Sequence, residues 1–319
     1  MILDTPHLER ERFSRDAAAK NLKPLWERMP RRPGSAAVPA IWRYAEVRPA
    51  LRRAAELITV REAERRVLVL ENPALSGTAF IAPSLFAGFQ LILPGEVAPA
   101  HRHTPNALRF IVEGEGVYTT VDGGRHAMRP GDFVVTRSWA WHDHGNLGSE
   151  PVIWMDGLDS PLAQVFGAYF HEDYIRDTQS VAECERPDRQ IRVYAWATMR
   201  ERLEHLARNE PPHDSHGYKL RYVDDQHRDP IPTLAVFLQS LPGGFAGSAY
   251  RSTECSVFHV AEGRGGVKIG QSEYDFAPHD VFVVPSWTPF QLRAQADCVL
   301  FSYSDRAAQE ALGFWREQP

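Results

Sequence analysis

Residues 95–116 read GEVAPAHRHTPNALRFIVEGEG, and residues 131–146 read GDFVVTRSWAWHDHGN. His101 and His103 are two positions apart, so on a β-strand both side chains project from the same face. His142 follows about forty residues later, within the second stretch. Short apolar runs and Gly-rich turns surround all three, which favours neighbouring strands of a small β barrel. We therefore expect three imidazoles to converge inside one barrel.

The same β pattern runs through residues 64–160. Short apolar runs alternate with turn signals such as Pro94-Gly95 and Pro130-Gly131. Such spacing is typical of an antiparallel barrel or sandwich. We expect strands at Val67–Leu70, Phe89–Leu93, Leu108–Val112, Val117–Val121, Phe133–Val135 and Val152–Met155.

A second copy of this pattern follows in the C-terminal part of the chain. Phe258–Gly265 loosely matches Phe110–Gly116, the run from Pro278 matches the run from Pro130, and Trp287 matches Trp139. The offset is 148 or 149 residues throughout. A constant offset indicates duplication of one small β domain.

We expect four segments along the chain. Polar stretches with helical spacing separate the two β regions, and apolar residues at helical spacing, among them Leu22, Leu25, Trp26 and Met29, precede the first. The expected segments are a helical N-terminal arm (1–63), a metal-binding barrel (64–160), a helical connector (161–228), and a metal-free barrel with a C-terminal tail (229–319).

Composition narrows the class of protein. The chain has 319 residues, of which 43% are hydrophobic and 24% are charged. Its formal net charge of −5 does not provide the excess of Lys and Arg that binding to nucleic acid needs. Cys184, Cys255 and Cys298 are odd in number and far apart, which argues against disulfides and a thiolate zinc site. The start of the chain is charged, and the longest apolar stretch, Ala79–Phe89, is about half a membrane span. We expect a cytoplasmic protein without a membrane or nucleic-acid partner.

Three neutral imidazoles would make a metal site with open positions. No cysteine and no nearby carboxylate competes for the metal in this stretch. A lone strand histidine is, however, usually a surface residue or a hydrogen-bonded core residue. The residues that surround the three histidines therefore have to decide between the two interpretations.

Those residues resemble the two motifs of the cupin family. The spacing of both motifs is kept, but Ala107 stands where most metal cupins place a glutamate ligand, and Arg137 and Trp139 replace a usual Pro and Gly. The resemblance implies an all-β dominated bicupin, that is, two double-stranded β-helix (jelly-roll) barrels with N-terminal and connecting helices. In the second half, Tyr250, Ser252 and Phe290 fall in the three histidine positions, so that barrel is expected to be structural.

Within the cupins, six stretches are similar to gentisate 1,2-dioxygenases and the related salicylate 1,2-dioxygenases. They are ERRVLVLEN (64–72), QLILPGE (90–96), HRHTPNALRF (101–110), WHDHGN (141–146), WMDGLD (154–159) and VVPSW (283–287). This resemblance implies an extradiol-type, non-haem iron dioxygenase of aromatic catabolism, a homotetramer with one Fe(II) per subunit in the first barrel. Such an enzyme uses O2 to open a 2-hydroxybenzoate ring between the carboxyl-bearing and hydroxyl-bearing carbons.

The resemblance also assigns roles to individual residues. His101, His103 and His142 would be the iron ligands, and Arg109 would pair with the substrate carboxylate. His144 would hydrogen-bond a substrate oxygen, and Gln90 would orient the substrate. Arg65 would add positive charge at the pocket mouth, and Asp156 would orient Arg109 or a metal ligand, although each could equally belong to an ordinary ion pair. These residues are all present at the matching positions.

Two departures bear on the substrate. Phe86 stands where the family resemblance leads us to expect Trp, and Gly88 would leave room beside it. A roomier, less polar wall favours salicylate or a 5-substituted salicylate such as 5-nitrosalicylate over gentisate. Two other classes stay open: a non-oxidative metal cupin of the isomerase type acting on a small carboxylate, and a metal-free sensor or storage cupin.

Overall fold

The computed structural model describes residues 5–181 and 191–318, so Cys184 lies outside the described residues. The chain divides into two compact units, Met1–Pro33 and Gly34–Pro319. Residues 34–63, which we expected in the N-terminal arm, therefore belong to the same unit as the β strands. The helices of this larger unit are α2 (Tyr44–Leu57), α3 (Val60–Ala63), η2 (Pro73–Leu75), α4 (Ser160–Val165), α5 (Trp196–Asn209) and α6 (Arg306–Ala311).

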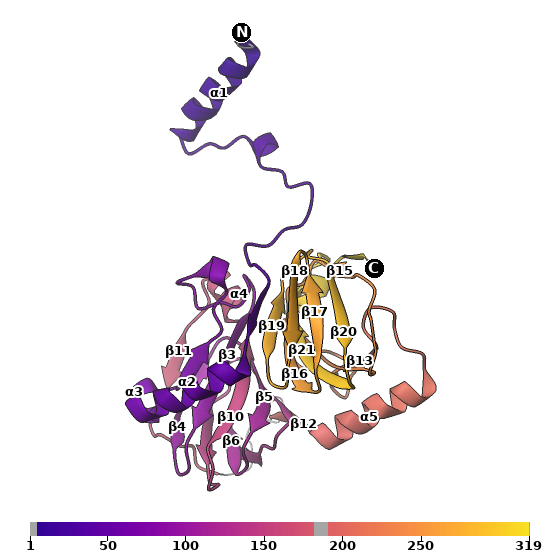
Figure 1. Ribbon diagram of the computed structural model, residues 1–319. Helices are drawn as coiled ribbons and strands as arrows, with labels where there is room; N and C mark the ends of the chain where they lie inside the picture. Colours follow the sequence, from indigo (N-terminus) through magenta and orange to yellow (C-terminus); the bar gives the residue numbers. More distant parts are fainter. Residues whose placement is uncertain (1–4, 182–190, 319) are drawn as a thin grey trace. The chain divides into compact units, whose positions relative to one another are not determined.

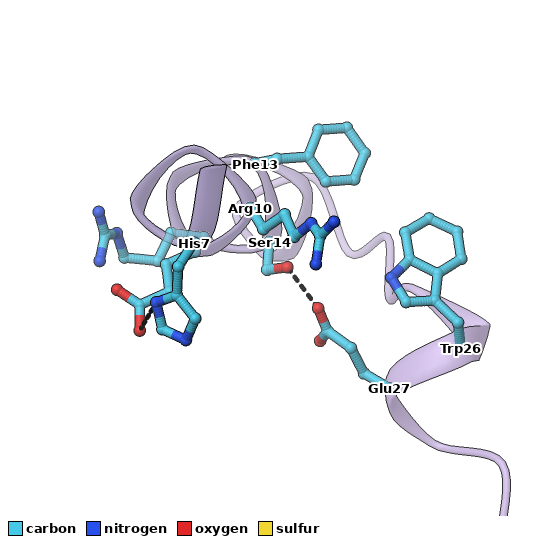
Figure 2. Close-up of a pocket in the computed structure, with 8 residues that line it drawn as sticks. His7, Arg10, Phe13, Ser14, Trp26 and Glu27 are labelled. Atoms are coloured by element: carbon cyan, nitrogen blue, oxygen red, sulfur yellow. Dashed lines mark hydrogen bonds and ion pairs between the residues drawn. The ribbon is translucent and has the colours of Figure 1, made fainter. Parts of the chain in front are cut away.

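The N-terminal unit consists of α1 (Thr5–Ala18) and a single 3-10 turn, η1 (Leu25–Glu27). Figure 2 shows the contact between them, in which the Ser14 hydroxyl donates a hydrogen bond to Glu27 at 2.6 Å. The helix that we expected around Leu22–Met29 is wrong. Pro24 lacks the N–H that a continuing helix needs, and the side chain of Trp26 remains 72% exposed.

The first barrel is formed by two antiparallel sheets. Their orders are β12-β8-β5-β10-β3-β2 and β11-β4-β9-β6-β7. The strands are β2 (Val67–Val69), β3 (Phe86–Ile92), β4 (Val97–His103), β5 (Ala107–Glu113), β6 (Val117–Val121), β7 (Gly124–Ala127), β8 (Phe133–Thr136), β9 (His142–Asn146), β10 (Val152–Leu158), β11 (His171–Asp173) and β12 (Arg192–Tyr194).

The second barrel repeats this arrangement, and Figure 1 shows its strands from residue 235 onward in orange and yellow. Its large sheet has the order β1-β19-β16-β21-β14-β13. From β19 to β13 this is the same succession of equivalent strands as from β8 to β2 in the first barrel, which supports the duplication read from the sequence. Its strands are β1 (Ala40–Trp42), β13 (Tyr218–Arg221), β14 (Ala235–Leu241), β15 (Arg251–Ser252), β16 (Ser256–Glu262), β17 (Gly265–Ile269), β18 (Ser272–Phe276), β19 (Val281–Val284), β20 (Phe290–Ala294), β21 (Cys298–Ser304) and β22 (Glu317–Gln318).

Several segments that we expected to be helical contribute strands instead. The arm residues Ala40–Trp42 pair with β19, and the connector supplies β11, β12 and β13 as edge strands. An edge strand satisfies the exposed backbone groups of the neighbouring barrel strand. Local helical patterning in these segments is overridden by this pairing.

One hydrophobic core joins the two barrels. Phe110 of the first barrel stacks on Phe301 of the second, with ring centroids 4.4 Å apart. The Tyr303 hydroxyl donates to the backbone oxygen of Phe86 at 2.6 Å, so the two large sheets are also tied by a hydrogen bond. The sheet that carries Phe86, Gln90 and Arg109 is therefore supported from behind by the second barrel.

Trp139 and Trp287 show that the duplication extends to backbone conformation. Both have positive φ, +63° and +57°, a region that costs a non-glycine residue roughly 1–2 kcal/mol. Each donates its backbone N–H to the carbonyl at the end of a strand distant in sequence, Trp139 to His103 and Trp287 to Ser252. Trp139 thus fixes the end of the strand that carries His101 and His103.

In the described part of the chain, no helix is long and apolar enough to cross a membrane.

Buried His259 makes the stability of this core depend on pH. Its ring is fully buried, neither nitrogen has a hydrogen-bond partner, and it faces Phe110 and His279 at centroid distances of 5.0 and 5.6 Å. Burial, reinforced by His279, holds the His259 pKa well below 6.5. The unfolded chain therefore takes up a proton near pH 6.5 that the folded chain excludes, and stability falls as the pH drops below that value.

We predict that His259→Leu reduces the loss of folding stability at low pH. Between pH 7 and pH 5 the wild type should lose more free energy of unfolding than the variant, by about 1.4 kcal/mol per pH unit at most. Urea unfolding at both pH values measures the difference, with exposed His205→Leu as control. An equal pH effect on wild type and His259→Leu would contradict this account.

Candidate active site

A cavity of about 380 Å³ opens in the first barrel, a size within the usual range for small-molecule sites. Its wall combines polar side chains from the strands, including Gln90, Arg109 and Asp156, with apolar ones such as Phe86 and Leu158. His101, His103 and His142 line the same cavity.

The three histidines are brought together by the pairing of β4 with β9. In this register His101 lies directly opposite His142, and His103 follows on the same face of β4. One ligand nitrogen from each ring lies within 4.8 Å of the other two. This is the only set of three histidines that the described residues bring together in this way.

Hydrogen bonds to backbone oxygens fix which nitrogen two of the three rings present, those of His103 and His142. Nδ1 of His103 donates to the backbone oxygen of Pro105 at 2.8 Å, and Nδ1 of His142 donates to that of Ala140 at 2.9 Å. A carbonyl oxygen can only accept, so the proton sits on Nδ1 and Nε2 keeps its lone pair. Nε2 of His142 is buried without any partner. An orphaned imidazole lone pair beside two others fits a divalent metal.

The charge state of the rings also suits metal binding. Burial lowers the pKa of His103 to about 4 and holds the pKa of His101 and His142 below 6.5. Nearby positive charge from Arg109 adds to the effect in all three cases. The rings are therefore neutral at pH 7, as a metal ligand must be.

Arg109 supplies a buried positive charge beside the histidines. Its Nη1 donates to the Thr136 hydroxyl at 2.7 Å, and its Nε lies 3.3 Å from Asp156. Asp156 in turn accepts a hydrogen bond from the Trp154 indole at 3.1 Å. Burial raises the pKa of Asp156 to about 6, opposed by Arg109. The pair is thus held in place from both ends and is only 4–5% exposed.

Several buried polar atoms of the site have no partner. They include Gln90 Nε2 and both ring nitrogens of His144. Buried polar groups are almost always hydrogen-bonded in folded proteins, so a cluster of unpaired ones indicates a place for a bound polar molecule or water.

Arg65 adds a second guanidinium at the cavity. Its Nη2 donates to the backbone oxygen of Pro99 at 2.7 Å and lies 3.3 Å from Nε2 of His101. Burial and the neighbouring Arg109 lower its pKa to about 9, so it keeps its charge at pH 7. Two guanidinium groups and one buried carboxylate, Asp156, surround the histidines, while the second carboxylate of the wall, Glu64, is exposed. The buried part of the wall therefore favours an anionic ligand.

Comparison with known proteins places the chain in a family. A Cupin domain model matches residues 88–158. Gentisate 1,2 dioxygenase 1 of Aquipseudomonas alcaligenes is 43% identical over 97% of this chain and 96% of its own length. The chain belongs to the gentisate 1,2-dioxygenase family.

Other family members agree with this assignment. The 5-aminosalicylate 1,2-dioxygenase of Comamonas sp is 32% identical over 95% of this chain and 88% of its own length. The solved salicylate 1,2-dioxygenase of Pseudaminobacter salicylatoxidans is 33% identical, with a TM-score of 0.87 over 100% of this chain and 99% of that one. The bicupin fold and the family resemblance expected from the sequence are both confirmed.

The structure brings most of the predicted site residues to one cavity. Its wall includes all three predicted metal ligands together with Arg65, Phe86, Gln90, Arg109 and Asp156. His144 is fully buried and is absent from the wall, although its ring lies 5.7 Å from that of His142.

Gly88 also lies off the cavity wall, and the space that we expected beside it is filled. A Cβ at Gly88 would lie 2.6 Å from Cγ1 of Val67, whose side chain lines the cavity instead. Val67 was missed because the β2–β3 pairing that places it there joins residues about twenty positions apart. Tyr169 and His171, which also line the cavity, come from the predicted connector and carried no local signal.

The second barrel holds no matching set of donors at the equivalent positions. The Tyr250 hydroxyl donates to Glu317 at 2.7 Å, and the Ser252 hydroxyl donates to Glu254 at 3.0 Å. Phe290 packs against Tyr250 with centroids 5.8 Å apart. The two hydroxyls thus donate to nearby carboxylates, and Phe290 offers no ligand atom.

Thr136 is the buried residue whose contribution to the site is simplest to test. Thr136→Val keeps the shape of the side chain but leaves Nη1 of Arg109 without its acceptor. We predict a loss of roughly 1–3 kcal/mol in the free energy of unfolding, measured by urea titration. Thr198→Val, on an exposed position of α5, is the matched control and should change little. Equal stability of the two variants would show that the Arg109–Thr136 hydrogen bond contributes nothing.

Proposed function

We propose that this protein is an Fe(II)-dependent ring-cleaving dioxygenase of 2-hydroxybenzoates. The proposal rests on the three histidines, of which one ring nitrogen each lies within 4.8 Å of the other two. They line one cavity together with the buried Arg109. Relatives named for gentisate and 5-aminosalicylate oxidation, and a solved salicylate dioxygenase with gentisate bound, support the substrate class.

His101, His103 and His142 would hold one Fe(II) per subunit. Three neutral nitrogens leave positions open for other ligands, as in other non-haem iron oxygenases. Iron bound there would supply the redox chemistry that lets dioxygen react with an aromatic ring, which side chains alone cannot supply. The subunit would act within a homotetramer.

The remaining residues would bind and orient the substrate. Arg109 presents a guanidinium already oriented by Thr136 and Asp156, so it can receive the substrate carboxylate with little rearrangement. The unpartnered amide of Gln90 would donate to a substrate oxygen, and Arg65 would add attraction for the anion at the mouth. His144 is buried beside His142 and is not part of the cavity wall, so its ring would have to turn into the cavity to donate to a substrate oxygen.

The bond cleaved would join the carboxyl-bearing and hydroxyl-bearing ring carbons, with both atoms of O2 entering an open-chain diacid. The sequence predicts an extradiol-type enzyme. That prediction would then apply to the use of Fe(II), because the substrate proposed here is a 2-hydroxybenzoate and not a catechol. Phe86, Val67, Ala107 and Leu158 give the cavity an apolar wall for the ring. Salicylate, 5-substituted salicylates and gentisate are the substrates that this wall and the relatives favour.

We predict that Fe(II)-loaded protein consumes O2 in step with the loss of substrate absorbance. Gentisate, salicylate, 5-nitrosalicylate, 5-chlorosalicylate and 1-hydroxy-2-naphthoate are offered in parallel. His103→Ala should abolish uptake, whereas His205→Ala, an exposed histidine on α5, should leave it unchanged. No uptake with any of the five despite full iron occupancy would reject the dioxygenase and favour a non-oxidative metal cupin.

A second prediction concerns recognition of the carboxylate. Arg109→Lys keeps the positive charge next to Asp156 but removes the planar pair of donors that matches a carboxylate. We expect kcat/KM to fall roughly tenfold to a hundredfold, mainly through KM, with iron content unchanged. An unaltered KM in steady-state kinetics would move the carboxylate site away from Arg109.

A further inference from the structure

A second group of metal-ligating side chains lies at the rim of the same cavity. One ligand atom each from Glu64, His171 and Asp173 lies within 4.8 Å of the other two. Glu64 and His171 line the cavity that contains the three histidines. None of the three side chains makes a hydrogen bond or ion pair with another residue that the structure describes.

The position of this trio is fixed by the backbone. β11 pairs with β4 so that His171 lies opposite His103 and Asp173 lies opposite His101. Paired residues of an antiparallel sheet project from the same face, so His171 and Asp173 share the face of the inner histidines. Glu172, between them, projects from the other face, where its carboxylate binds Arg102.

The two groups differ in charge in a way that matters for an incoming cation. The inner histidines are neutral, and the guanidinium groups of Arg65 and Arg109 stand beside them. A dication in that site would therefore lie near two positive charges, which disfavour its approach. The rim trio instead offers two carboxylates and one imidazole, a donor set that suits first-row divalent metals.

We propose that Glu64, His171 and Asp173 form an outer divalent-cation site that loads the inner three-histidine site. Its exposed carboxylates capture a hydrated cation at the mouth, and the neighbouring imidazoles of β4 take it up. This inference rests on the inner site of the proposed function, but its test does not use ring cleavage.

The test uses Co²⁺ alone, added to metal-free protein without oxygen. Equilibrium dialysis should find two Co²⁺ per wild-type chain, one bound tightly and one weakly. His171→Ala/Asp173→Asn should lose the weak equivalent, and His103→Ala should lose the tight one. Glu172→Gln, on the same strand but the opposite face, is the matched control and should keep both.

The rate of loading is the second readout. At limiting Co²⁺, the visible absorbance of the inner site should develop about tenfold more slowly in the rim double variant than in Glu172→Gln. A single equivalent in the wild type, two equivalents in the double variant, or equal loading rates in the double variant and Glu172→Gln would each overturn the proposal. Absence of tight binding alone would instead reject the inner site.

Discussion

The antiparallel pairing of β4 with β9 is the constraint on which the candidate site depends. Its register puts His101 opposite His142, and the two-residue period of β4 adds His103 on the same face. A slip of one residue would turn the β4 imidazoles to the other side of the sheet. Trp139 opposes such a slip, because its backbone N–H donates a hydrogen bond to the carbonyl of His103. Trp139 adopts an unfavourable positive φ to make this bond.

The other half of the site depends on burial. Arg109 and Asp156 sit on β5 and β10, whose sheet is covered from behind by the second barrel through Phe301 and Tyr303. A buried ion pair is costly unless its geometry is held. The second barrel, which has Tyr250, Ser252 and Phe290 at the equivalent positions, thus has a clear physical role: it covers the sheet that holds Arg109.

Much of the fold and of the site could be predicted from the sequence. Strand positions followed from apolar runs and turn residues, which are local signals, and the duplication followed from a constant offset of 148 or 149 residues between similar stretches. The candidate metal ligands and Arg109 followed from the spacing of two motifs and from the family resemblance. Strand positions and the His101–His103 pair depend on residues close together in the chain.

The features that were missed depend on distant pairing. Val67 fills the space beside Gly88 because β2 lies next to β3, and His171 reaches the cavity because β11 adds to the edge of β4. The sequences of β2 and β11 alone do not show with which strand each of them pairs. The helix expected around Leu22–Met29 failed for the opposite reason: its apolar spacing was a local signal, but Pro24 interrupts it and the side chains remain exposed.

An anaerobic crystal structure with Fe(II) and salicylate, recorded at the iron absorption edge, would test the account most directly. The account predicts one strong anomalous peak per chain within bonding distance of Nε2 of His101, His103 and His142. It also predicts the salicylate carboxylate on the Arg109 guanidinium. Iron bound without the three histidines, or a carboxylate held away from Arg109, would contradict it.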